Sequence, residues 1–386
     1  MNLNPIFKGK IMLRLSLMTT HFIISIFLTV ASLLSTKSHC ADNSPIQLND
    51  TLFFQTIHGD LRVEDPLAIE LIQSPLMQRL NHVYQYGVNE FVLPAKAYHY
   101  TRFDHCLGVY QILKARGASR LEQIAGLLHD ASHTVFSHTM DFLFMGGMNK
   151  GSYQDSIHAQ FLKDYGAQEI LEKHGCTIED VLPDKPEFLC LEQPHPWLCA
   201  DRIEYILHAG DLEGFMSIQE IQETHTDLQF DGHNWFFNTP EIAERFAFIS
   251  LNQTLTTWGS PENLLVAHWI TDITKILWKQ DEISHDDIHF NLKDVDLWKK
   301  ILASMEFTIQ ELREKALKVN DLFDVIEDEE ESSENYLVYY AKFRGVDPLV
   351  SIDESLIPLT QISKKYKQDY EGVKQHIHNG WRIKFR

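Results

Sequence analysis

The sequence predicts a mainly α-helical protein: a helical bundle with one small β-hairpin and a mixed C-terminal region. Residues 67–213 carry apolar side chains at helical spacing, interrupted by Gly, Pro and Asn. The runs 224–230 and 234–238 are rich in β-branched and aromatic residues, and Asp231-Gly232 between them is typical of a hairpin turn. Residues 336–343 alternate enough for a strand. Long helical segments with few strands therefore define the fold class.

The N-terminus has the order of a secretory signal peptide. Lys8, Lys10 and Arg14 precede an apolar stretch, 21–34, and small and polar residues lead to Ala41. An uncleaved membrane anchor fits less well, because a spanning helix needs about 20 apolar residues. We therefore expect residues 1–41 to be a signal peptide and the protein to be exported, to the periplasm or beyond the cell.

The remaining chain, 42–386, is long enough for one large helical domain or for two domains. We divide it into a catalytic domain, 42–214, and a C-terminal helical extension with short β elements, 215–386. The formal net charge of −20 argues against nucleic acid as the main partner, because such binding needs clustered Lys and Arg. It does not exclude a single nucleotide.

Helix start and stop signals set the expected elements that follow an irregular segment, 42–65, with one short strand. Ser119 with Glu122 three residues later forms a capping-box pattern, which begins the helix that ends at His129-Asp130. The other expected helices are Thr101–Ala115 before Gly117, Pro196–His208 before Gly210, and 260–278 with Ser260 as the cap and Pro261 in the first turn. The acidic run Glu327–Glu334 is expected to be a solvated loop.

His129 and Asp130 together point to a metal-centred hydrolase. His105 upstream and Asp201 downstream raise the number of possible ligands to four. Imidazole with carboxylate suits Mn, Fe, Zn, Co or Ni, with Mg as an alternative. Four protein ligands leave positions open for water, which a metal can activate for hydrolysis.

Helical spacing places a second polar group beside two of these ligands. Arg102 and His105 share a helix face, as do Asp201 and Tyr205. One residue of each pair can hold metal while the other holds substrate phosphate. Simpler roles exist: a lone histidine is more often a core or surface residue, Arg102 can pair with a nearby acid, and Tyr205 can be a core aromatic.

Two strings extend these observations to a family. Thr-Arg-Phe-Asp-His-Cys-Leu-Gly-Val at 101–109 and Leu-Leu-His-Asp-Ala-Ser-His-Thr-Val-Phe-Ser-His at 127–138 resemble the HD-domain metal-dependent phosphohydrolases. The likeness is closest to the branch of deoxynucleoside triphosphate triphosphohydrolases, the dGTPase-like enzymes. Further matches at Ile57–Asp60, Leu80–Gly87, Trp258–Glu262 and Phe343–Pro348 extend it over residues 51–350.

The resemblance implies an HD-domain helical bundle and a role for each site residue. His105, His129, Asp130 and Asp201 would be the metal ligands. Arg102, His133, His138 and Tyr205 would face the phosphates, and Gln85 would contact sugar and base. Catalysis would involve His133, His138, His158 and Asp130, since a histidine with a near-neutral pKa can pass a proton to a leaving oxygen.

Two departures from the branch bear on the substrate. Gln154-Asp155 stands where the branch has a His-Glu pair, and His158 one turn later is a candidate replacement. Ala209 stands where the branch has an acid that meets the sugar 3′-hydroxyl, which weakens the case for deoxynucleotides.

We therefore expect a metal-dependent phosphohydrolase that cleaves a phosphate or triphosphate ester of a nucleotide, and a homo-oligomer as in this branch. One alternative is an HD hydrolase of another phosphoester, such as a guanosine polyphosphate or a cyclic nucleotide. The other is an inactive metal-binding or nucleotide-binding sensor. Export would permit disulfides among the four cysteines after the signal peptide, although Cys106 is expected to be buried and free.

Overall fold

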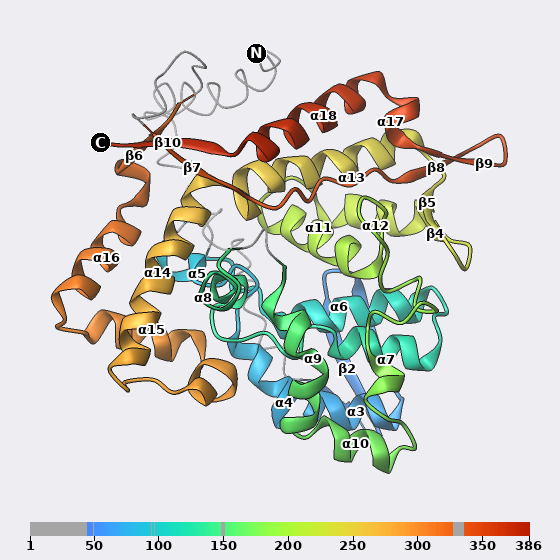
Figure 1. Ribbon diagram of the computed structural model, residues 1–386. Coiled ribbons are helices and arrows are strands. Elements are labelled where there is room, and N and C mark those ends of the chain that lie inside the picture. The colour runs from blue at the N-terminus through green and yellow to red at the C-terminus, as the bar shows by residue number, and fades with distance from the viewer. Residues whose placement is uncertain (1–44, 49, 94, 96, 148–150, 327–335) are drawn as a thin grey trace, which may run out of the picture. The chain divides into compact units, whose positions relative to one another are not determined.

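Helices make up most of the chain, and three small sheets accompany them (Figure 1). The structure, a computed structural model, describes residues 45–386 except 49, 94, 96, 148–150 and 327–335. The expected signal peptide and the acidic run therefore lie outside the described residues. The mainly α-helical prediction is confirmed. Within the described residues, no helix is both long enough and apolar enough to cross a membrane.

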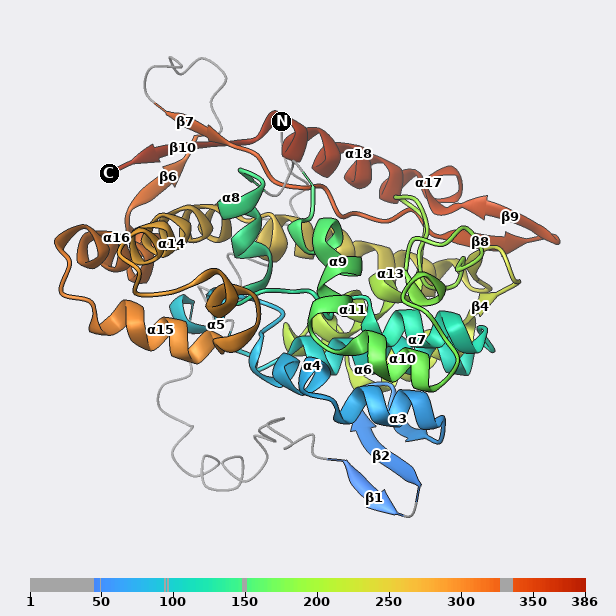
Figure 2. The ribbon, with the colours of Figure 1, turned by 60° about the horizontal axis from the view of Figure 1, so that its bottom comes forward.

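The N-terminal segment is a three-stranded antiparallel sheet rather than an irregular stretch with one strand. Its strands are β1 (Ile46–Leu48), β2 (Thr51–Thr56) and β3 (Gly59–Val63), in the order β1-β2-β3. Leu52 and Phe54 of β2 are buried, while intervening residues are more exposed, so one face of the sheet packs on the helical core. Figure 2 shows this sheet beside α3.

The helices that carry the expected site begin where side chains cap them. Thr101 and Asp104 form a capping box at the start of α6 (Arg102–Ala115), and Ser119 caps α7 (Arg120–Leu128). The other helices of this part are α3 (Pro66–Gln73), α4 (Pro75–Gln78), α5 (Asn89–Val92), α8 (Asp141–Phe144), α9 (Tyr153–Asp164), α10 (Ala167–Lys173) and α11 (Ala200–Leu212). Helix α6 packs against both α7 and α11.

Helix α11 begins four residues later than predicted and continues past Gly210. The preceding residues form turns instead: the Trp197 N–H donates to the Pro194 carbonyl, and the Ala200 N–H donates to the Cys190 carbonyl. These contacts use backbone groups that an earlier helix start would need. Asp201 consequently lies in the first turn of α11.

The hairpin is present but shorter than predicted. Helix α12 (Ile218–Asp227) takes residues 224–227, because Ser217 and Glu220 form a capping box and the helix runs on from it. The strands β4 (Leu228–Phe230) and β5 (Trp235–Phe237) then pair antiparallel. The predicted strand 336–343 is also short, and only Leu337–Tyr339 form β7.

The C-terminal part surrounds α13 and α14 with short elements. Its helices are α13 (Pro240–Gln253), α14 (Pro261–Lys279), α15 (Asp294–Ala303), α16 (Phe307–Leu317), α17 (Leu359–Ile362) and α18 (Lys364–Asn379), and its remaining strands are β6 (Phe323–Val325), β8 (Leu349–Ile352), β9 (Ser355–Pro358) and β10 (Trp381–Phe385). The sheets have the orders β6-β10-β7 and β4-β5-β8-β9. The start of α14 at Ser260-Pro261 is as predicted.

Two apolar clusters hold these elements together. The larger contains residues from Leu52 in β2 to Ile377 in α18, so it joins segments from both ends of the described chain. The smaller gathers around α14, α15 and α16, which lie together in Figures 1 and 2. The larger cluster includes Cys106 and Leu128, which flank the proposed ligands, and therefore anchors the helices that carry them.

Candidate metal centre

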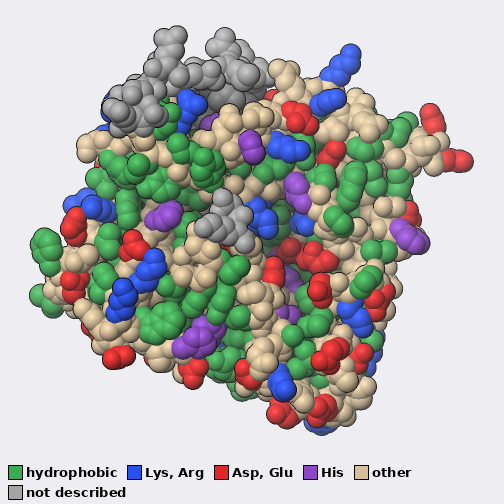
Figure 3. Space-filling view, viewed as in Figure 1, with side chains coloured by type: hydrophobic (Ala, Val, Ile, Leu, Met, Phe, Trp, Pro, Cys, Tyr) green, Lys and Arg blue, Asp and Glu red, His purple; other side chains and the backbone are tan. Residues whose placement is uncertain are grey.

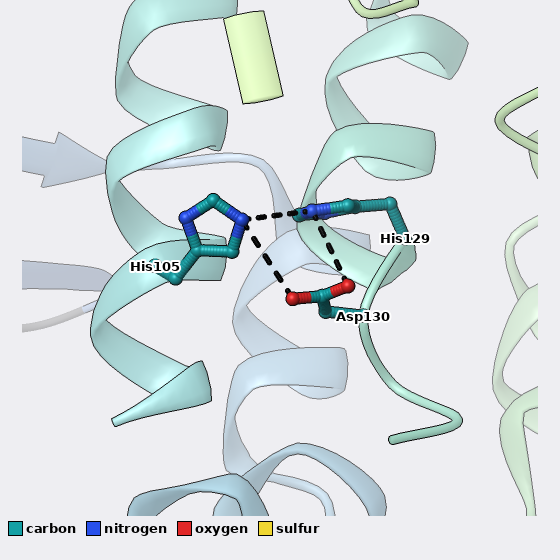
Figure 4. A group of neighbouring side chains, drawn as sticks. All are labelled: His105, His129 and Asp130. Carbon is teal, nitrogen blue, oxygen red and sulfur yellow. Dashed lines mark hydrogen bonds and ion pairs between the residues drawn. The ribbon is translucent and has the colours of Figure 1, made fainter. Parts of the chain in front are cut away.

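The four predicted ligands lie together. His105 is in the first turn of α6, His129 and Asp130 directly follow α7, and Asp201 is in the first turn of α11. Figure 4 shows the side chains of His105, His129 and Asp130 converging from α6 and the end of α7. These three are buried, with 1%, 6% and 4% exposure.

The donor atoms have separations that suit a single ion. The two Nε2 atoms of His105 and His129 are 3.1 Å apart, and Asp201 Oδ1 lies 3.0 Å from the first and 3.7 Å from the second. Each Asp130 oxygen lies 3.6 Å from one of these nitrogens. Metal–nitrogen bonds of about 2.1 Å place two ligands roughly 3.0–3.4 Å apart in octahedral or tetrahedral geometry. The residues therefore fit a divalent transition metal.

Charges within this group are strongly coupled. Burial lowers the pKa of His105, but Glu204, Asp201 and Asp130 raise it to about 10. Burial raises the pKa of Asp130, but Arg102 and the histidines hold it well below its usual range. Both aspartates are therefore ionised, since hydrogen bonds from the histidines also lower the pKa of Asp201. Two ionised carboxylates, the buried Asp130 and the partly exposed Asp201, attract a cation.

Each ligand histidine is oriented through its other nitrogen. His129 Nδ1 lies 2.7 Å from the carbonyl oxygen of Gly126, which can only accept a hydrogen bond. His105 Nδ1 donates to the carboxylate of Glu204. Both rings therefore present Nε2 to the same point, the tautomer that metal binding requires.

The predicted phosphate contacts have partners within the protein. Arg102 Nη1 donates to Asp130 Oδ2 at 2.5 Å, and Arg102 Nε donates to Ser137 Oγ at 3.1 Å. His133 Nε2 lies 3.3 Å from Asp130 Oδ1. His138 Nδ1 lies 2.9 Å from Asp141 Oδ2, and its ring is 4.8 Å from that of His133. Burial and Arg102 lower the pKa of His133 to about 3, so this histidine is neutral near pH 7.

The other predicted substrate residues are also buried. Burial raises the pKa of Tyr205 to about 12, so its phenol keeps its proton. Gln85 is 9% exposed, and its Oε1 has no hydrogen-bond partner among the described residues. His158 is 4% exposed, with Nδ1 2.9 Å from Ser132 Oγ and Nε2 unpartnered within the described chain. Burial lowers the pKa of His158 to about 4.

Known proteins are similar in sequence to this chain, one of them over most of its length. It is 30% identical over 329 residues to the uncharacterized protein YdhJ of Bacillus subtilis, and the match covers 85% of this chain and 97% of YdhJ. It is 34% identical over 203 residues to the metal-dependent phosphohydrolase cns2 of Cordyceps militaris, covering 52% of this chain and 55% of cns2. It is also 35% identical over 145 residues to human SAMHD1, a deoxynucleoside triphosphate triphosphohydrolase, covering 32% of this chain and 23% of SAMHD1.

The chain belongs to the HD-domain metal-dependent phosphohydrolases. It spans about half the length of cns2 and about a quarter of SAMHD1. The fold also resembles the crystal structure of a phosphohydrolase from Bacteroides thetaiotaomicron, with a TM-score of 0.64, 14% identity, and coverage of 86% of this chain and 99% of that one. No protein-family model matches the chain.

Two cations near the centre of this phosphohydrolase were not predicted. Lys342 and Arg344 lie in the segment after β7, whose backbone is anchored beside the start of α11: His195 Nε2 lies 2.7 Å from the Gly345 carbonyl oxygen. Arg344 lowers the pKa of Lys342, and Asp155 and Asp201 act in the opposite direction. Arg344 lies within the Phe343–Pro348 match, and Lys342 directly precedes it.

Lys and Arg side chains lie beside Asp and Glu side chains in the hollow over α11 (Figure 3). Neither Lys342 nor Arg344 forms an ion pair with another described residue. We call Gln85, His158, Lys342 and Arg344 the substrate side of the site, and the four predicted ligands the metal side.

A second group, Glu192, Cys199 and Asp201, also has donor atoms close enough for an ion. It suits a metal less well, because Arg202 Nη1 lies 3.3 Å from Cys199 Sγ and burial raises the pKa of the Cys199 thiol. Cys106, Cys176, Cys190 and Cys199 are all buried and free, so the prediction for Cys106 is confirmed and the described residues contain no disulfide.

Proposed function

We propose that this phosphohydrolase cleaves a phosphate or triphosphate ester of a nucleotide at a centre held by His105, His129, Asp130 and Asp201. The observation that carries the proposal is the convergence of two imidazole nitrogens, 3.1 Å apart, with two ionised carboxylates in a buried site. A bound divalent transition metal supplies activated water and polarises the phosphoryl oxygen.

The protein's own groups then bind and orient the substrate. Lys342 and Arg344 lie where a polyphosphate can neutralise their charges, and charge-assisted hydrogen bonds to phosphate are strong. Tyr205 keeps its proton and can donate to a phosphate oxygen. Arg102 already donates a hydrogen bond to Asp130, so in this arrangement it positions that carboxylate.

Proton transfer to the leaving oxygen falls to His158 or His133. The Gln154 side chain accepts a hydrogen bond from the Ser132 hydroxyl at 2.8 Å, and its amide cannot take over proton transfer from the histidine of the missing His-Glu pair. His158 lies beside the same hydroxyl and has a nitrogen to spare. Both histidines are neutral, and phosphate charge next to either would favour its protonated form.

The sugar is not selected through the position of Ala209. This residue is fully buried and packs with Tyr86 and Tyr100, so it offers no polar contact to a 3′-hydroxyl. SAMHD1, the partial relative, acts on deoxynucleoside triphosphates. No acid is available at Ala209 to bind the 3′-hydroxyl, which ribose and deoxyribose both carry, so we expect this position to make no contribution to binding of either sugar.

The test is product analysis on the purified protein loaded with Mn²⁺. Deoxynucleoside and ribonucleoside triphosphates, guanosine polyphosphates, cyclic nucleotides and a simple aryl phosphate are compared for release of phosphate or triphosphate. His129→Ala/Asp130→Ala is the matched inactive variant. Release from nucleotides that is lost in the variant supports the proposal.

Release from only another phosphoester would reassign the substrate. A wild-type protein that binds metal and nucleotide without turnover would establish the alternative of an inactive sensor. That alternative is motivated by Gln154-Asp155 in place of the His-Glu pair.

We further propose export and homo-oligomerisation. The mature N-terminus, read by mass spectrometry of the native protein, and the mass in solution test these two points.

A further inference from the structure

A buried polar network lies behind His105, on the side away from the donor atoms of the other three ligands. One oxygen of Glu204 accepts hydrogen bonds from His105 Nδ1 and from the Tyr100 hydroxyl. The other oxygen lies 3.3 Å from His58 Nε2 and 2.9 Å from His208 Nδ1. Glu204 is completely buried. All its polar contacts are therefore made within the protein.

Glu204 has no Lys or Arg partner among the described residues, since its ion pairs are with His58, His105 and His208. A buried carboxylate is costly unless opposite charge or several hydrogen bonds compensate it. Here histidine rings supply the compensation, and one of them, His105, directs its other ring nitrogen at the metal side.

Elements far apart in the sequence build this network. His58 comes from the turn between β2 and β3. This turn is part of the Ile57–Asp60 match, to which the resemblance assigns no site residue. Its Nδ1 lies 2.8 Å from Nε2 of His225, which comes from α12. The side chain of His58 is 3% exposed. The N-terminal sheet and α12 therefore meet at the hydrogen bonds that hold Glu204.

Gly108 leaves the space that Glu204 occupies. A Cβ atom at this position of α6 would lie 2.5 Å from Glu204 Oε1 and 2.6 Å from its Cγ. Any side chain there would push the carboxylate away. Gly108 lies one turn after His105, so the same helix supplies the ligand and the room for its partner.

We propose that Glu204 is the positioning residue of the metal centre: it holds His105 with Nδ1 protonated and Nε2 directed at the ion. His58, His208 and Tyr100 hold Glu204 in turn. A carboxylate behind a ligand histidine fixes its tautomer and raises its basicity. His129 relies on the neutral Gly126 carbonyl instead, so of the two ligand histidines only His105 has a carboxylate behind its ring. This inference rests on the metal centre of the proposed function.

The test is the affinity for Mn²⁺ and Zn²⁺, measured by competition with a chelator on the full-length protein. Glu204→Gln keeps the shape and removes the charge, and we expect binding to weaken about 10- to 100-fold. Glu122→Gln is the matched control, because Glu122 is also a buried glutamate, with hydrogen bonds to the N–H groups of Cys190 and Leu191. Its variant should bind metal as the wild type does.

A folded Glu204→Gln protein with wild-type affinity would overturn the role. Should that variant fail to fold, Tyr100→Phe decides, because it removes one hydrogen bond to Glu204 and keeps the ring. Affinity weakened a few-fold supports the proposal, and unchanged affinity overturns it.

Nitrogen NMR of the zinc-loaded protein gives an independent readout. One histidine should show a strongly hydrogen-bonded Nδ1–H that Glu204→Gln shifts, and a signal that does not move would contradict the role. A wild type that binds no metal overturns the proposed function and this role together. A wild type that binds metal and turns over, with an unaffected Glu204→Gln, overturns only the role of Glu204.

Discussion

His105 and His129 each use one nitrogen in a hydrogen bond inside the protein, and both turn the other nitrogen to the same point. On the substrate side, His158 and Gln85 each have a buried polar atom without a partner among the described residues. Lys342 and Arg344 have no ion pair with the described chain. The metal side is thus satisfied internally, whereas the substrate side keeps free hydrogen-bonding capacity.

The difference separates what this protein shares with its family from what is its own. The metal side has all four ligands that the resemblance implies. The departures from the branch, at Gln154, Asp155 and Ala209, all lie outside the metal side. Chemistry and substrate choice therefore depend on different groups, and mutations on the two sides should have different kinetic signatures.

The largest effect is expected on the metal side. Asp201→Asn keeps the size of the side chain but removes a charge that lies 3.0 Å from His105 Nε2. Because a metal supplies several kcal/mol of transition-state stabilisation, hydrolysis should fall at least about 1,000-fold, with metal content falling in parallel. Asp164→Asn, at an exposed position of α9, is the control. Full activity in Asp201→Asn would remove this residue from the ligand set.

On the substrate side, His158→Gln should lower kcat about 100-fold and leave metal content unchanged. General acid catalysis contributes about that much, and Nε2 of His158, which has no partner among the described residues, can supply it. The control is His268→Gln, in α14, because burial lowers the pKa of this histidine as well. Equal kcat values for the two variants would mean that His133 or water, rather than His158, donates the proton.

Lys342→Ala and Arg344→Ala should each raise KM for a nucleoside triphosphate about 10- to 100-fold, since a hydrogen bond to a charged group contributes about 1.5–3 kcal/mol. Their effect on kcat should be smaller. Lys367→Ala, on the exposed face of α18, should change neither constant. If kcat fell while KM stayed constant, these cations would act on the transition state rather than on binding.

The smallest effect concerns the anchor of the Lys342–Arg344 segment. Burial, with Arg202 and Lys342, lowers the pKa of His195 to about 4. The unfolded chain takes up this proton near pH 6.5, so stability should fall as the pH drops from about 6.5 towards 4. His195→Gln keeps a donor for the Gly345 carbonyl and removes the titration.

The free energy of unfolding of the metal-free protein, from urea titrations at pH 5 and 7, measures this. The free energy of unfolding of the variant should depend on pH less than that of the wild type. The difference in slope should correspond to the uptake of at most one proton on unfolding. Identical slopes would mean that His195 titrates alike in the folded and unfolded states.

Local patterns in the sequence predicted much of the metal side. Ser119 caps α7 as expected, and α6 begins directly after Thr101, within one residue of the predicted start, because a cap needs only neighbours three residues away. Those two helix starts set the places of His105 and His129-Asp130 on their helices. The structure brings the four predicted ligands together, and their roles stay predictions until metal is measured.

The same local signals failed where long-range contacts decide the outcome. The start of α11 depends on a hydrogen bond from Ala200 to Cys190, and the N-terminal strands depend on a core that covers one face of their sheet. The first part of the expected hairpin differs from these two cases, because a local signal, the capping box of Ser217 and Glu220, begins α12 there. Competing helix and strand signals of similar strength are settled by packing.

The sequence by itself therefore determined the helical class, the family and the residues that can hold a metal, because these depend on residue type and on spacing within one or two helical turns. Only the tertiary structure decided which residues hydrogen-bond to the ligands from behind and which residues face them across the site. Glu204 reaches His105 across 99 positions of sequence, and His58 reaches Glu204 across 146. Lys342 and Arg344 come to the site from a segment anchored at His195. No local period encodes such partners, because their meeting is a property of the packed core.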